Sequence, residues 1–212
     1  MSTIVTRMFD TYEHASMAVT ELEQNGIAHA NISLVANNSD DRYSSMISAD
    51  RTADHVVGHD TATTAGTGAG TGATLGTVLG GGAGLLAGLG MLAIPGVGPV
   101  VAAGWLIATA VGAGVGAASG GLLGSLVGAG VSETDAHVYA EGVRRGGTLV
   151  TVRADDAQVA RVESVLDAPT PVDIAARRNE YQAEGWTAHD TSATPYTSEQ
   201  ILAERARRAA SV

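Results

Sequence analysis

The stretch "SETDAHVYAEGVRRGGTLVTVRA", residues 132–154, sets the pattern from which the fold can be worked out. Ser132 followed by Asp135 resembles a capping box, which begins a helix. The glycine pair at 146–147 ends that helix. The β-branched run that follows predicts a strand over 148–154. This part of the chain therefore predicts a helix that leads directly into a strand.

The N-terminal residues predict a second unit with similar elements. A β-branched run predicts a strand over 3–9, and Asp10 with Glu13 predicts a capped helix that ends at Gly26. The run "NISLVAN" predicts another strand over 31–37. Residues 3–37 therefore form a β-α-β unit, whose two strands run parallel if they share a sheet.

Downstream of the opening stretch, one more helix and one more strand are expected. Asp155 is the predicted cap of a helix that ends at Pro169, and "PVDIAARR" predicts a fourth strand over 171–178. The order β-α-β, then α-β-α-β, indicates an α+β domain. We expect a ferredoxin-like small sandwich, with its helices packed on one face of a four-stranded sheet.

The middle of the chain has a different composition. Of the 28 glycines, 22 lie within 61–132, and this span of 72 residues contains no Asp, Glu, Lys, Arg or His. An ordinary protein surface carries charges, so the segment is either sheltered from water or disordered. The acidic residues of the flanks give a net charge of −10, which excludes the basic face that nucleic acid requires. The chain has no Cys, so disulfides and thiolate metal sites are excluded.

Many of these glycines recur at a spacing of four residues. Two prolines and two glycines in "IPGVGPV", residues 94–100, predict a turn between helices over about 71–94 and 99–130. The expected fold is therefore interrupted by a long glycine-rich antiparallel α-helical hairpin. The turn is assigned to Pro95, Gly96, Gly98 and Pro99. The residues expected to pack helices together and to drive oligomerisation are Gly68, Gly72, Gly76, Gly80, Gly84, Gly88, Gly104, Gly112, Gly116, Gly120, Gly124 and Gly128.

Energetics limit where such helices can exist. Each interior glycine costs about 1 kcal/mol relative to Ala, so these helices should not form alone in water. Lipid or a dry protein core would favour them, because small residues let helix backbones approach closely. A stripe of spacing four winds around a helix, so several neighbours are needed to cover it. We therefore expect a homo-oligomer, and leave open membrane insertion, a soluble assembly and disorder.

The composition also divides the chain. The expected parts are a first half of the α+β domain over 1–38, a polar linker over 39–65, the glycine-zipper hairpin over 66–131, a second half of the domain over 132–180, and a tail over 181–212 with a possible short helix at 198–210. The tail is expected to move freely or to become ordered only against a partner.

No motif in the chain predicts an enzyme. The patterns G-x-G-x-x-A at 68–73 and 112–117 lack the preceding strand and the following acidic residue of a dinucleotide site. His55 and His59 have a metal-like spacing but are interpreted as linker residues in water. We expect no catalytic residue, no metal and no cofactor.

Two motifs carry a resemblance to a known family. The turn at 94–99 and the segment "YAEGVRRGG" at 139–147 are similar to those of the general stress protein 17M-like (YflT-type) family, over about residues 3–185. The resemblance implies a bacterial stress-response protein and gives no catalytic residues. The predicted function is a non-enzymatic protein that self-assembles and inserts into or associates with membrane lipid. The alternatives are a soluble ring, shell or filament, and a binder of lipid or a small apolar ligand.

The expected location follows from the first residues. The chain becomes acidic near Asp10 before any long apolar run, which is unlike a secretory signal. We therefore expect a cytoplasmic protein or one on the cytoplasmic face of the inner membrane.

Overall fold

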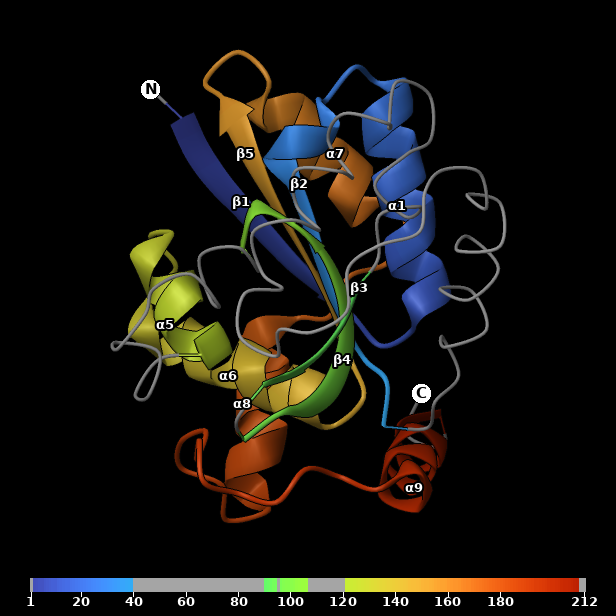
Figure 1. Ribbon diagram of the computed structural model, residues 1–212, viewed down its shortest axis with the longest axis vertical. Coiled ribbons are helices and arrows are strands. Elements are labelled where there is room, and N and C mark those ends of the chain that lie inside the picture. Colours follow the sequence, from blue (N-terminus) through green and yellow to red (C-terminus); the bar gives the residue numbers. More distant parts are fainter. Residues whose placement is uncertain (1, 40–89, 95, 107–120, 210–212) are drawn as a thin grey trace, which may run out of the picture.

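The computed structural model describes residues 2–39, 90–94, 96–106 and 121–209. These residues form an α+β fold around a five-stranded antiparallel sheet of order β1-β5-β2-β4-β3 (Figure 1). The strands are β1 (Ser2–Phe9), β2 (Ile32–Asn37), β3 (Gly90–Ile94), β4 (Gly98–Gly104) and β5 (Thr148–Asp155). The helices are α1 (Tyr12–Gln24), α5 (Gly121–Gly128), α6 (Glu133–Arg144), α7 (Val159–Asp167), α8 (Ile174–Ala183) and α9 (Ser198–Ala209), with a 3₁₀ turn η1 (His29–Asn31).

Residues 132–154 supply helix α6 and strand β5, which lies in the interior of this sheet. Ser132 Oγ accepts a hydrogen bond from the Asp135 amide at 3.1 Å and so caps α6, and β5 follows as expected. Strand β5 pairs antiparallel with β1 on one side and with β2 on the other. The parallel relation of β1 and β2 is therefore confirmed, with β5 inserted between them.

Helices cover both faces of the sheet, which corrects the prediction of helices on one face of four strands. Val150 and Val152 of β5 face the core beneath α1 and α7, whereas Leu149 faces the core beneath α5 and α6. Figure 1 shows these two groups of helices on either side of the strands. The physical reason is that the central strands are apolar on both faces, and all six residues of β2 are buried. A ferredoxin-like sandwich is not confirmed.

The prediction of two helices that meet at this turn is wrong for the described residues on either side of the turn. Residues 90–94 and 98–104 form the paired strands β3 and β4, and the turn between them is where the prolines and glycines placed it. Short apolar runs fit a helix or a strand equally well, and here the sheet provides backbone partners for both segments. Helix α5 agrees with the distal part of the second predicted helix. Segments 40–89 and 107–120 lie outside the described residues.

Three local predictions are also wrong. The fourth strand expected over 171–178 is replaced by helix α8, since Asp173 accepts a hydrogen bond from the Ala176 amide at 3.0 Å and caps a helix. Asp155 is the last residue of β5 and does not cap α7. Thr11 caps α1 in place of Asp10, whose carboxylate instead binds arginine side chains from α8 and α9.

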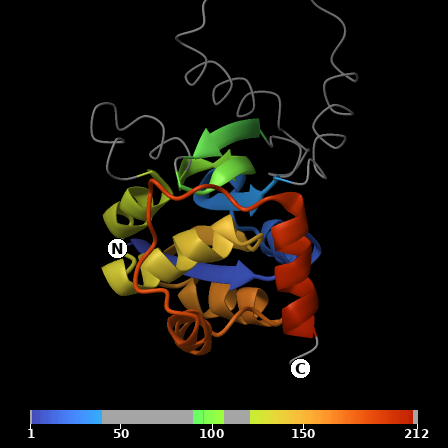
Figure 2. The ribbon, with the colours of Figure 1, turned by 90° about the horizontal axis from the view of Figure 1, so that it is seen from below.

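The C-terminal tail packs against the body of the protein, so the expectation of a free tail is wrong for residues 181–209. Tyr181 is fully buried, and Ile201 of α9 is 1% exposed. The short helix expected near 198–210 is present as α9 and lies along one side of the molecule (Figure 2). Among the described helices, none combines the length and the apolar character needed to cross a bilayer.

Candidate functional site

The residues predicted to pack helices together and those predicted to form the hairpin turn lie in different parts of the structure. Gly104 lies in β4 and therefore takes no part in helix packing. Gly124 and Gly128 lie on α5, and Gly96, Gly98 and Pro99 lie in or beside the β3–β4 turn. The remaining predicted residues are outside the described part of the chain, namely Gly68, Gly72, Gly76, Gly80, Gly84, Gly88, Pro95, Gly112, Gly116 and Gly120.

Gly104 has a clear role within the sheet. Its φ of +95° is unfavourable for residues with a Cβ, and a Cβ built there would lie 2.2 Å from the Ile32 carbonyl oxygen. The glycine therefore lets β4 approach β2 closely where the strand ends. Gly104 therefore serves the pairing of strands and not the packing of helices.

Helix α5 presents its glycines to the outside. Its inner face buries Leu122 and Leu126, which are 1% and 0% exposed. On the other face, Val127 is 41% exposed, and a Cβ built at Gly124 or Gly128 would meet no atom within 4 Å. This outer face of α5, defined by Gly124, Val127 and Gly128, carries no ionisable group and has open space above it in the described structure.

Strand β3 lies beside α5 and is also uncharged. Ile94 of β3 would be 3.4 Å from a Cβ built at Gly121, the first residue of α5. Within the described residues β3 pairs only with β4, and Met91 on β3 is 51% exposed.

A second feature, which the sequence did not predict, is a buried ionic cluster that joins α6 to the C-terminal segment. At its centre, Arg145 Nε donates to Glu141 Oε1 at 2.7 Å, and Arg145 Nη1 donates to Glu184 Oε2 at 2.6 Å. The other Glu141 oxygen lies 3.3 Å from His189 Nδ1. The side chains of Glu141 and His189 are each 2% exposed.

The electrostatics of this cluster favour a charged Glu141. Burial raises the pKa of its carboxyl group, but the hydrogen bonds from His189 and Arg145 and the charge of Arg144 outweigh burial and lower that pKa to about 2. Both carboxylate oxygens already have protein partners. Glu141 is therefore a fixed anion that holds its partners together, and it is poorly suited to act as a general base.

The cluster extends to α9 through further arginines. Arg208 Nη1 donates to Asp10 Oδ1 at 3.0 Å, and Arg177 holds the same carboxylate with two hydrogen bonds of 3.0 Å. Arg208 Nη2 also donates to Glu204 Oε1 at 2.7 Å. The Arg145 guanidinium lies 4.1 Å from the centre of the Tyr181 ring. Sequence reasoning missed most of these contacts because they pair residues that are far apart in the chain. Its signals were the "RR" pairs at 144–145, 177–178 and 207–208 and the spacing of four between Glu204 and Arg208.

A small hollow between α6 and α8 has no evident catalytic arrangement. Its volume is about 220 Å³, and it is lined by Glu133, Thr134, His137, Arg178, Gln182, Trp186 and Thr187. Arg178 is bound to Asp135, so its charge is already compensated. No group of three metal-ligating side chains occurs among the residues that the structure describes.

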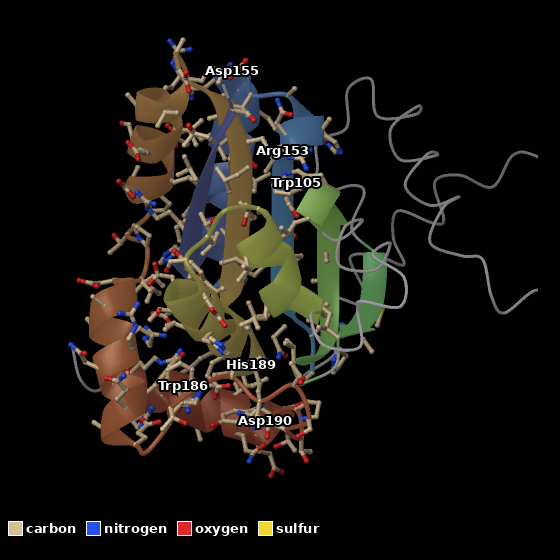
Figure 3. The ribbon with its side chains drawn as sticks, turned by 90° about the vertical axis from the view of Figure 1, so that its left-hand side faces the viewer. Trp105, Arg153, Asp155, Trp186, His189 and Asp190 are labelled. Atoms are coloured by element: carbon tan, nitrogen blue, oxygen red, sulfur yellow. The ribbon has the colours of Figure 1, made fainter. Side chains whose placement is uncertain are left out.

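Trp105 packs within the protein at the opposite end of the molecule from His189 and Trp186 (Figure 3). The Arg153 guanidinium lies 3.6 Å from the centre of its ring, and its Nε1 donates to the Asn31 carbonyl at 3.2 Å. These contacts give Trp105 a structural role.

No family model, curated protein sequence or solved structure matches this chain. The resemblance to the general stress protein family therefore stays a prediction.

Proposed function

We propose that this chain is a non-enzymatic, stress-associated protein that assembles with copies of itself through its glycine-rich region. The observation that carries this proposal is the outer face of α5, on which Gly124, Val127 and Gly128 are exposed above a buried Leu122 and Leu126. This helix face is small and uncharged, and at its two glycines no atom of the residues that the structure describes packs against it.

The physical case for assembly concerns close approach. Two glycines four residues apart let another backbone come near enough for extensive dispersion contacts. Because a Cβ at Gly124 or Gly128 would meet nothing within 4 Å, the described fold does not require glycine at these positions. Glycine in a helix destabilises that helix, by about 1 kcal/mol for each residue relative to Ala. Contact with a second copy would offset this cost.

Membrane association is a second candidate, supported by composition. The 72 residues of 61–132 have no ionisable side chain, and such a span is compatible with lipid. Strands β3 and β4, however, belong to the sheet, which supports assembly of copies in water over a hairpin that spans the bilayer. Lipid contact, if it occurs, would involve the remainder of the segment.

The experiment compares particle mass for the full chain and two variants. We expect multi-angle light scattering at micromolar concentration to give a mass above the monomer value of 21.3 kDa. Val127→Glu should reduce that mass, because it places a charge on the outer face of α5. Met17→Glu is the matched control, since Met17 is 54% exposed on α1, and it should leave the mass unchanged. A monomeric parent in buffer and in mild detergent would contradict the proposal.

The same proteins test the membrane candidate. Flotation with phosphatidylcholine vesicles, which carry no net charge, avoids repulsion of this acidic chain. Parent protein that floats would support lipid association, and parent protein that stays at the bottom as a large particle would support the soluble assembly alone.

A further inference from the structure

The hollow between α6 and α8 gathers polar side chains from three parts of the chain. They include Glu133 and His137 of α6, Arg178 and Gln182 of α8, and Trp186 in the segment after α8. The two residues from each helix are four positions apart, so each pair lies on one face of its helix. The hollow therefore lies between one face of α6 and one face of α8.

The orientation of His137 makes it a hydrogen-bond donor toward the hollow. The His189 amide donates to His137 Nδ1 at 3.2 Å. In an uncharged imidazole the accepting nitrogen has no proton, so Nε2 carries the proton and is the nitrogen that can reach a ligand. A histidine that binds a metal through one nitrogen usually donates a proton from the other, whereas here the other nitrogen accepts. The arrangement at His137 therefore favours an acceptor atom over a metal ion.

Two further donors on the side chains that line the hollow lack acceptors. Nε of Arg178 and Nε1 of Trp186 are buried and have no hydrogen-bond partner among the residues that the structure describes. Buried donors without partners are uncommon in folded proteins, because each has lost its hydrogen bonds to water. Both atoms are closed to water in the described conformation, so a ligand would reach them through small shifts of the two side chains. Oxygen atoms of a ligand would then satisfy donors that the protein leaves unpaired.

The charges around the hollow leave one carboxylate unbalanced. Arg178 forms an ion pair with Asp135, so these two charges compensate each other. Glu133 is exposed at the hollow and forms no ion pair with any residue in the described part of the chain. Its negative charge suits an ammonium group, whereas the net charge of −10 on the whole chain would repel a ligand that is itself an anion.

We propose that this hollow binds a free α-amino acid, with the ammonium group beside Glu133 and the carboxylate beside His137 Nε2 and the Arg178 guanidinium. Trp186 Nε1 would donate to the same carboxylate, and the indole ring would contact a small apolar side chain. The volume of about 220 Å³ is below the range of about 300 to 1,000 Å³ for sites that hold drug-sized molecules, and it suits a ligand of this size. Binding here does not depend on the proposed self-assembly.

Nuclear magnetic resonance of the isotopically labelled full chain tests the proposal, because the chain has only two tryptophans. Each indole N–H gives its own signal, and Trp186→Phe identifies the signal of Trp186. Titration with L-alanine should shift that signal saturably, with a midpoint of about 1 mM for so small a ligand. The Trp105 signal should not move, because its Nε1 donates to the Asn31 carbonyl at the opposite end of the molecule (Figure 3). No saturable shift of the Trp186 signal up to about 50 mM L-alanine would overturn the proposal.

Smaller probes and a charge variant test the two ends of the ligand separately. Acetate carries only the carboxylate and methylammonium only the ammonium, so each should bind at least about fivefold more weakly than L-alanine. Glu133→Gln should weaken L-alanine binding about fivefold without weakening that of acetate. Glu13→Gln is the matched control, since Glu13 is likewise an exposed acid in the first turn of a helix, and it should leave L-alanine binding unchanged. Acetate that binds as tightly as L-alanine, or a Glu133→Gln protein with the L-alanine affinity of the parent, would refute the assignment of the hollow to an amino acid.

Discussion

Replacing Glu141 with Gln removes the central charge of the ionic cluster while nearly keeping the shape of the side chain. The fall of the Glu141 pKa from 4.5 to about 2 corresponds to about 3 kcal/mol in favour of the charged form in the folded protein. Breaking a buried ion pair by removal of one partner costs about 3 to 5 kcal/mol, which is of similar size. We therefore expect Glu141→Gln to lower the free energy of unfolding by about 3 kcal/mol at pH 7.

The pH dependence supplies the sign of the effect. Because the pKa of Glu141 is depressed in the folded state, its contribution is fully present above the unfolded value of 4.5 and is lost as the pH falls toward 2. The pKa values of Asp10 and Glu184 are also lowered, so these residues lose their contributions to stability at low pH in the parent and in the variant alike. The difference in the free energy of unfolding between parent and variant therefore reports on Glu141 alone, and this difference should shrink steadily below pH 4.5.

Urea unfolding followed by circular dichroism measures this difference between pH 7 and pH 3 at fixed salt. Glu21→Gln, which changes an exposed acid on α1, is the control and should differ from the parent by no more than about 0.5 kcal/mol. A gap at pH 7 of less than about 1 kcal/mol, or one that stays constant down to pH 3, would refute the assigned role of the Glu141 charge.

Three further substitutions test the packing and the charge contacts. Gly142→Ala would place a Cβ 2.2 Å from the buried Met8 Sδ and should cost about 1 to 3 kcal/mol in thermal unfolding, part of which Met8→Ala should restore. Gly104→Ala combines a positive φ with a Cβ 2.2 Å from a backbone oxygen, and should cost about 3 kcal/mol or more and accelerate amide exchange in β4. Asp10→Asn weakens the contacts of Arg177 and Arg208 with a half-buried carboxylate, so urea unfolding should show a loss of about 1 kcal/mol that decreases at high salt.

The elements that the sequence predicted correctly are those whose signals are local. Strands β1, β2 and β5 and helices α1 and α6 have a regular apolar period together with glycine stops, and a cap or a β-branched run at the start. The parallel relation of β1 and β2 followed from the helix that connects them. Local patterns were therefore sufficient for the three adjacent strands β1, β5 and β2 and for one helix on each face.

The failures occurred where distant residues decide the structure. The run at 98–104 has apolar and small residues that fit either state, and it becomes a strand because β2 and β3 provide backbone partners. The apolar pattern of 171–178 predicts a strand, but Asp173 caps a helix there and the segment forms α8. The ionic cluster could not be predicted, since one sequence does not indicate which arginine meets which carboxylate.

The position of β5 between β1 and β2 has a consequence for the order of folding. Thr6 and Thr151 face each other across this sheet, although they are 145 positions apart in the chain. During synthesis, β1 and β2 emerge long before the strand that separates them, so the sheet cannot close until the uncharged span of 61–132 has already left the ribosome. The nascent chain thus contains this whole uncharged span before the strand that completes the sheet has been made.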